Sequence, residues 1–396
     1  MSREAATSDT RLIWCVAIGQ TIGWGTLFSV FPLFIEPLEA AFGWSRAEVN
    51  AGLTLALLVG GLVAVPVGRM VDRQGGRRLL ALGAFGGSAL LAALAMVNSL
   101  PMFWAIWATM GLVQATALWG PAMALVIGTA RNPARAIAGI TFVTGFTTTV
   151  FVPFGAWLIE SLGWRGALLA LAAIQAVPGM LTLAMLPPDP QRPATAPPAG
   201  FSLWQAVRRP AFLGLTGCFA AHAFIATGLG AHAIPMFRER GLPEASVLLL
   251  VALHGPCQVA ARAALFGLGN RVTMRGVGRL ATLLTPLAML ALAFAPSEFL
   301  WLLPYVLAWA VADGLMTIVR AAGVAEILGR EGFGALTGAL SAATMLPRTL
   351  APVLIALLWE GSGGYGFLPW LLAGLGVVAV ACFALAAAAR PAAVSA

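Results

Sequence analysis

Charged residues are scarce in this chain. They make up 10% of its 396 residues, against 60% hydrophobic residues, whereas soluble domains carry about 25% charged residues. A water-soluble protein of this size could not cover its surface with so few charges, but a lipid bilayer can solvate an apolar surface. The composition therefore excludes an ordinary soluble protein and predicts a membrane protein with membrane lipids as partners.

Lysine is absent, so all 23 basic residues are arginines, and the net charge is +8. A basic chain can indicate nucleic-acid binding. Here, however, the arginines lie in short segments between apolar runs, which is the pattern of the positive-inside rule. We therefore expect no nucleic-acid partner.

Residues that carry catalytic or metal chemistry are also few. The four cysteines, Cys15, Cys218, Cys257 and Cys382, each lie alone in an apolar run and have no metal-ligand spacing. The sequence contains no nucleophile–base pair and no phosphate-binding loop. We expect no enzyme activity, no catalytic residues, no metal and no cofactor, and ATP-driven transport would need another subunit.

Long apolar runs fill most of the chain. They are continuous and about 20 residues long, as transmembrane helices require, whereas barrel strands would be about ten residues with strict alternation. The predicted spans are 12–35, 49–68, 79–97, 102–129, 138–159, 166–186, 211–236, 245–267, 278–296, 299–325, 334–358 and 365–389.

A proline-rich stretch at 187–210 interrupts this pattern and is typical of a linker. We predict an N-terminal six-helix bundle at 1–186, a cytoplasmic linker at 187–210 and a C-terminal six-helix bundle at 211–396. The fold class is thus an all-α membrane protein of twelve transmembrane helices in two pseudo-symmetric bundles. Turns that join glycine to an aromatic residue, at 161–170 and 361–370, lie at matching places in the two halves.

The distribution of arginines predicts the orientation. With both termini inside, 16 of the 23 arginines fall in cytoplasmic segments, four fall in outside loops and three fall within spans. Because the positive side faces the cytoplasm, we expect a multi-pass protein of the bacterial inner membrane with both termini cytoplasmic.

One motif follows the second span. It resembles the signature of the major facilitator superfamily, a glycine followed by Asp-Arg, a second glycine and two basic residues. The matching residues are Gly68, Asp72, Arg73, Gly75, Arg77 and Arg78. The resemblance implies that this loop is a gating latch on the cytoplasmic side during alternating access. The alternative is that it only anchors the topology.

Arg279, at the start of the span 278–296, is counted with the cytoplasmic segment before it. Four other charges lie inside predicted spans, all in the second half: Arg262, Asp313, Arg320 and Arg348. A charged side chain at mid-bilayer costs about 2.5–3.5 kcal/mol on insertion scales, so each one needs a reason. Their sum is +2, which favours an anion, because guanidinium groups bind carboxylates in bidentate fashion. The alternatives are that Asp313 only neutralises an arginine and that Arg320 serves the structure.

A narrower resemblance concerns span 8. Gln258 precedes Arg262 by four residues, and residues 42–46 read Phe-Gly-Trp-Ser-Arg. Both features are similar to the bacterial monocarboxylate-transporter and oxalate:formate exchanger branch of that superfamily. The resemblance implies that Arg262 and Arg348 bind the substrate, and Gln258 and Arg320 are further candidates for substrate binding. The chain departs from the branch where Gln258 replaces an acidic residue and Ser29 replaces a basic one.

The three histidines, His222, His232 and His254, also lie in the second half. Histidine titrates near neutral pH, although each of these can instead be a packing residue. We take Asp313 and His222, both near mid-span, as candidates for proton coupling. Neutral polar residues of the first half offer an opposite wall of the substrate site; those assigned to it are Gln20, Ser29 and Gln114.

The sequence thus predicts a monomeric secondary active transporter that moves a small carboxylate-type anion, with proton symport as one mode of coupling. An efflux carrier for drug-like or amphipathic compounds is the alternative, and it would favour an acidic cavity. A membrane receptor or scaffold without transport activity is a third hypothesis, but it would not require the gating motif.

Overall fold

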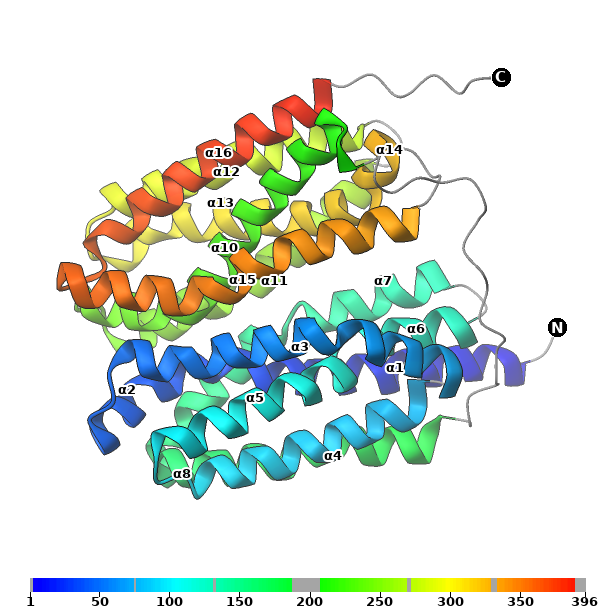
Figure 1. The fold of residues 1–396 in the computed structure, drawn as a ribbon, viewed down its shortest axis with the longest axis horizontal. Coiled ribbons are helices and arrows are strands. Elements are labelled where there is room, and N and C mark those ends of the chain that lie inside the picture. Colours follow the sequence, from blue (N-terminus) through cyan, green and yellow to red (C-terminus); the bar gives the residue numbers. More distant parts are fainter. Residues whose placement is uncertain are drawn as a thin grey trace. The chain divides into compact units, whose positions relative to one another are not determined.

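The computed structural model describes residues 3–74, 76–130, 133–186, 207–268, 272–328 and 333–388 (Figure 1). Within these ranges every regular element is a helix. The chain divides into two compact units, Met1–Thr195 and Ala196–Ala396. Most of the predicted linker, 187–206, lies outside the described residues, so the boundaries 1–186, 187–210 and 211–396 stay predictions.

The first unit contains eight α-helices and one π-helical segment among its described residues. They are α1 Arg3–Trp24, η1 Gly25–Ser29, α2 Phe31–Phe42, α3 Arg46–Gln74, α4 Gly76–Ala95, α5 Leu100–Ala117, α6 Trp119–Thr129, α7 Pro133–Thr144 and α8 Thr147–Met185. Helix α4 packs along α8, α3 packs along α5, and α1 packs against α7 and α8.

The second unit is built in the same way. Its described helices are α10 Pro210–Glu239, α11 Glu244–Leu268, α12 Met274–Phe294, α13 Phe299–Ile318, η3 Val319–Gly323, α14 Val324–Leu328, α15 Phe333–Ser362, η4 Tyr365–Phe367 and α16 Leu368–Ala388. Helix α10 packs against α15 and α16, and α13 packs against α11 and α12. This packing brings α10, α11 and α13 together around the polar side chains of the unit.

Eleven helices in the described parts of the chain are long and apolar enough to cross a membrane. One of them, Gly139–Met185, is 47 residues long and covers two of the predicted spans, 138–159 and 166–186. Within it, Gly163 has φ 70° and ψ 167°, a left-handed conformation that interrupts the helix. The number of twelve spans stays a prediction.

The outer surfaces of the helices are apolar. Leu82 is 68% exposed, and Phe294 and Leu300 are each 73% exposed. Water would disfavour such a surface, whereas lipid tails are as apolar as these side chains. The exposed apolar side chains thus agree with a protein that spans the bilayer.

Glycines allow close helix contacts in both units. A Cβ atom on Gly111 of α5 would collide with the carbonyl oxygen of Ala56 in α3. A Cβ atom on Gly214 of α10 would lie 2.5 Å from the carbonyl oxygen of Cys382 in α16. Because helices in lipid associate through van der Waals packing rather than through the hydrophobic effect, small residues at such contacts stabilise the bundle.

Two π-helical turns interrupt otherwise α-helical spans. The first, η1, begins at Gly25, where the ring of Phe151 occupies the position of a side chain. The sequence Gly23-Trp24-Gly25 predicted bending in this region. The second, η3, carries Arg320. π-Helical turns are frequent at functional sites because they redirect side chains.

Candidate functional site

Only part of the predicted gating motif can be described. The side chains of Asp72 and Arg73, and the whole of Gly75, lie outside the described residues. A Cβ atom on Gly68 would meet no atom of its own unit within 4 Å. The expectation that Gly68 permits a close helix contact therefore finds no such contact within the first unit, and the latch stays a prediction.

Arg77 has a structural partner that the sequence did not indicate. Its Nη2 donates to the carbonyl oxygen of Leu183 at 2.6 Å, and its Nε donates to that of Thr182 at 3.4 Å. Both carbonyls lie in the last turn of α8. Thr182 O also accepts from Leu186 N at 3.3 Å, so Leu183 O is the acceptor for which Arg77 matters most. Arg77 thus caps α8, and a cation is also favoured at this negative end of the helix dipole. Arg78 is exposed.

The neutral residues assigned to the opposite wall lie in the first unit. Gln20 is 3% exposed and donates from Nε2 to Ala117 O at 2.9 Å. Gln114 is 9% exposed and donates to Leu27 O at 2.8 Å. Ser29 is half-buried at the end of η1. Both glutamines join helices of their own unit, and contact with a substrate stays a prediction for all three.

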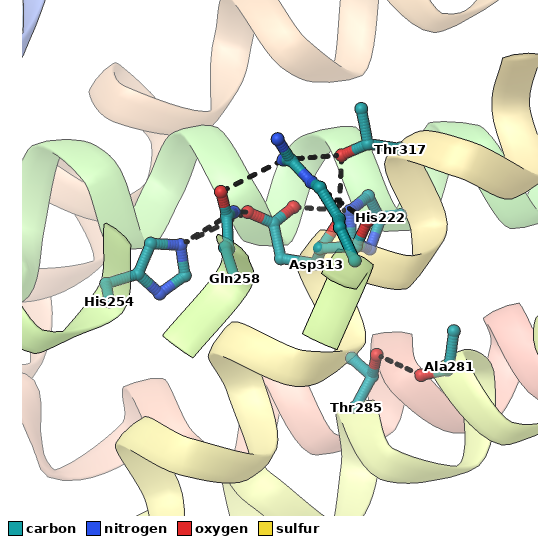
Figure 2. Close-up of polar contacts among 9 residues, drawn as sticks. His222, His254, Gln258, Ala281, Thr285, Asp313 and Thr317 are labelled. Atoms are coloured by element: carbon teal, nitrogen blue, oxygen red, sulfur yellow. Dashed lines mark hydrogen bonds and ion pairs between the residues drawn. The ribbon is translucent and has the colours of Figure 1, made fainter. Parts of the chain in front are cut away.

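Asp313 of α13 is the centre of a polar cluster in the second unit. His222 of α10 places Nε2 2.9 Å from Asp313 Oδ1, and His254 of α11 places Nε2 3.2 Å from Asp313 Oδ2. Gln258 of α11 donates from Nε2 to the same Oδ2 atom. Figure 2 shows Asp313 between Gln258 and His222. Two imidazole rings and one amide, from two helices, therefore surround one carboxylate.

Arg262 continues this cluster along α11. Its Nη2 donates to Gln258 Oε1 at 3.1 Å and to Thr317 Oγ1 at 3.4 Å, and its Nε donates to Gly314 O at 3.4 Å. All three acceptors are neutral. Since arginine only donates hydrogen bonds, it fixes the Gln258 amide with its oxygen toward Arg262 and its nitrogen toward Asp313.

Arg320 and Arg348 form a second basic group. Arg320 donates to Ser341 Oγ and Thr344 Oγ1, both on α15 and both at 3.4 Å. Arg348 lies one helical turn beyond Thr344 on α15. Both residues therefore place like charges on neighbouring turns, and among the described residues Arg348 has no hydrogen bond or ion pair.

No arginine pairs with Asp313 among the residues that the structure describes. The carboxylate is bonded instead by His222, His254 and Gln258. Three intramembrane arginines therefore have no carboxylate partner in the described part of the second unit. This arrangement argues against the alternative that Asp313 neutralises an arginine.

Sequence reasoning missed two members of the cluster, His254 and Thr317. The signal for His254 was its spacing, because His254, Gln258 and Arg262 recur every four residues and so share one face of α11. Thr317 follows Asp313 by four residues in the same way, and its hydroxyl donates to Asp313 O at 2.9 Å.

His232, by contrast, is a packing residue. It is fully buried, with Nδ1 2.7 Å from Tyr365 Oη and Nε2 2.8 Å from Pro352 O. Both ring nitrogens therefore have partners within the unit, and His232 joins α10 to α15 and η4.

The described helices define a multi-pass α-helical membrane protein. The family model of the Major Facilitator Superfamily matches residues 13–280, which is more than half of the chain. The chain belongs to the Major Facilitator Superfamily, and it is therefore a membrane transporter with the all-α fold of that family. Members of this family are generally not enzymes. The comparison with curated proteins found no match, and the family model does not distinguish the monocarboxylate or oxalate:formate branch.

Proposed function

We propose that this transporter is a secondary active carrier of a small organic anion of the carboxylate type, working by alternating access in the bacterial inner membrane. The observation that carries the proposal is the pair Arg320 and Arg348. Arg320 reaches Ser341 and Thr344 of α15, whose hydroxyl groups are neutral, and Arg348 follows Thr344 by one helical turn.

Such a pair is costly without a ligand. A charge within a membrane-spanning helix costs about 2.5–3.5 kcal/mol on insertion scales, and two like charges add their repulsion. An anion between the guanidinium groups would relieve the repulsion and accept charge-assisted hydrogen bonds from both. The carboxylate is the common metabolite group whose geometry fits this arrangement.

Arg262 bonds to a residue close to Arg320 in the chain. Its Nη2 donates to Thr317 of α13, which lies three residues before Arg320 of η3. Its bonds to neutral acceptors, two of them at 3.4 Å, are long. Arg262 is thus free to turn toward an anion held at Arg320 and Arg348, and we assign all three arginines to the substrate site.

The efflux alternative requires an acidic cavity for cationic or amphipathic compounds. Within the central turns of the described spans of the second unit, Asp313 is the one carboxylate, and histidines and an amide already bond it. The charge balance of this unit therefore favours an anion.

Uptake into proteoliposomes tests the proposal. Labelled lactate, formate, oxalate and succinate would be offered to wild type, Arg348→Gln, Arg320→Gln and the control Arg279→Gln. Arg279 is an exposed arginine in the first turns of α12, so its replacement removes the same charge elsewhere. Saturable uptake that is lost in the first two variants and kept in the control is the expected result. No uptake of any anion by folded wild-type protein would refute the proposal.

A further inference from the structure

The nitrogen atom His254 Nε2 faces two neighbours with opposite demands. Asp313 Oδ2 lies 3.2 Å away and requires a proton on this nitrogen. Gln258 Nε2 lies 3.0 Å away and, as an amide donor, requires a lone pair there. A protonated Nε2 donates to the carboxylate, but its N–H points at the N–H of the amide. An unprotonated Nε2 accepts from the amide, but its lone pair points at the carboxylate oxygen.

The orientation of Gln258 decides between these states. Arg262 holds the amide oxygen at 3.1 Å, which turns the amide nitrogen toward His254 and Asp313. If Arg262 moved away, the amide would be free to turn its donors elsewhere. His254 would then gain a proton without opposing a second donor.

The ring of Trp309 also favours the protonated form of the neighbouring imidazole rings. Its centroid lies 5.4 Å from that of His222 and 6.2 Å from that of His254, whose ring is nearly parallel to the indole. An imidazolium on an indole face is stabilised by the cation–π interaction. Trp309 also lies one turn before Asp313 on α13, so both residues face the histidines.

The charged and titratable groups that face this cluster come from three helices. They are His222 of α10, His254 and Arg262 of α11, and Asp313 of α13.

The charges on the other packed elements have partners elsewhere or lie at the helix ends. Arg320 of η3 bonds to α15, and Arg348 is beside Arg320. Helix α12 carries Arg275, which lies 4.0 Å from Glu326 of α14, and the exposed Arg279 in its first turns.

We propose that His222, Asp313 and His254 form a proton-binding site, and that Gln258 is the positioning residue that couples its protonation to anion binding at Arg262. The coupling rests on the proposed function as an anion carrier, whereas the proton site does not depend on it. An arriving carboxylate draws Arg262 from Gln258 Oε1, the amide turns, and a proton from water binds His254 Nε2 and is shared with Asp313 Oδ2. No covalent bond other than this N–H bond forms.

The sign of the coupling follows. Because anion binding promotes proton uptake, the anion binds more tightly at lower pH, and its dissociation constant rises with pH through the titration of the site. One proton per anion gives a change of about tenfold per pH unit at most, and coupling is reciprocal, so the anion also moves the titration midpoint upward.

The fluorescence of Trp309 provides the first measurement, without ligand. The chain has 13 tryptophans, so the signal of Trp309 is taken as the difference between wild type and Trp309→Phe in lipid nanodiscs. Protonated imidazole quenches indole, and we expect one pH transition that His254→Gln abolishes. Asp313→Asn should move its midpoint to lower pH, since the anionic partner is lost. His232→Gln is the matched control and should leave the transition unchanged.

The second measurement adds lactate or oxalate. In wild type the carboxylate should raise the midpoint, whereas in Gln258→Leu the midpoint should not respond to it, although the anion still binds at the arginines. A Gln258→Leu protein whose midpoint shifts as much as that of wild type would overturn the coupling. A merely structural role for Gln258 would lower stability without separating binding from its pH dependence.

A third measurement needs no variant. Wild-type protein in unbuffered solution with a pH indicator should take up about one proton for each carboxylate bound. Binding without proton uptake would overturn the coupling. If no carboxylate binds at all, the anion carrier fails while the ligand-free transition of Trp309 still decides whether the proton site exists. Absence of that transition in folded protein would refute the site.

Discussion

Replacing Arg348 by glutamine should lower anion affinity and raise stability at the same time. The substitution removes one of two like charges that lie on neighbouring helical turns, while glutamine keeps a polar but shorter side chain. The loss of a charge-assisted hydrogen bond to the anion costs about 1.5–3 kcal/mol, which is about 10- to 150-fold in affinity.

The gain in stability has the opposite origin. A like-charge pair inside a membrane protein is destabilising, and its removal should contribute about 1 kcal/mol, or about 1–3 °C in melting temperature for a chain of this size. Uptake assays give the Michaelis constant for the anion, and thermal unfolding followed by size-exclusion chromatography gives the stability without ligand.

The expected effects of Arg348→Gln on anion affinity and on stability have opposite signs, which distinguishes them from misfolding. A variant that is simply misfolded would lose both transport and stability. If Arg348→Gln melts at a lower temperature than wild type, the two arginines are not held as an unpaired couple, and our reasoning about the site is wrong. If it melts higher but transports carboxylates normally, Arg348 has no role in binding them.

Three further predictions concern stability and folding. Thermal unfolding of the purified protein checks the first and the third, and the yield of folded protein checks the second. Arg77→Ala should lower the stability by about 1 kcal/mol because Leu183 O in the last turn of α8 loses the arginine donor, whereas the adjacent Arg78→Ala should have little effect; equal losses would argue against the cap. Gly111→Ala should reduce the yield of folded protein because the added Cβ meets the backbone of α3. Gly120→Ala, where a Cβ meets nothing within 4 Å, should be tolerated, and similar yields would contradict this packing. Tyr365→Phe should cost about 1–3 kcal/mol because His232 Nδ1 would be buried without its donor; an unchanged melting curve would show that water or another group replaces the hydroxyl.

Much of the fold was predictable from the sequence because the bilayer imposes a simple rule. Every backbone polar group in hydrocarbon must be bonded within its own segment, so long apolar runs become helices. The signature after the second span indicated the superfamily that the family model matches. The composition separates two spans at 138–159 and 166–186. Gly163 lies between them, and its left-handed conformation interrupts the helix there, because a single glycine changes the direction of the chain without adding polar residues.

The candidate site was predictable in part. Intramembrane charge singled out Asp313 and the arginines, because its cost makes each such residue exceptional. The sequence did not indicate which charges pair. It named Arg262 and Arg348 as substrate-binding residues, whereas the structure places Arg320 against the turn of α15 that precedes Arg348. It also assigned Arg77 to the gating motif, whereas its side chain bonds to the end of α8, more than 100 residues away in the chain.

The sequence by itself determined that the chain is helical, spans a membrane and carries an excess of positive charge within its second half, since composition and periodicity are properties of local segments. The tertiary structure decided the partners of each polar side chain. His254 and His232 are both single histidines in apolar helices, yet one meets a carboxylate and the other a tyrosine and a backbone carbonyl. Which groups meet depends on how α10, α11 and α13 pack, and that packing is set by contacts between residues far apart in the sequence.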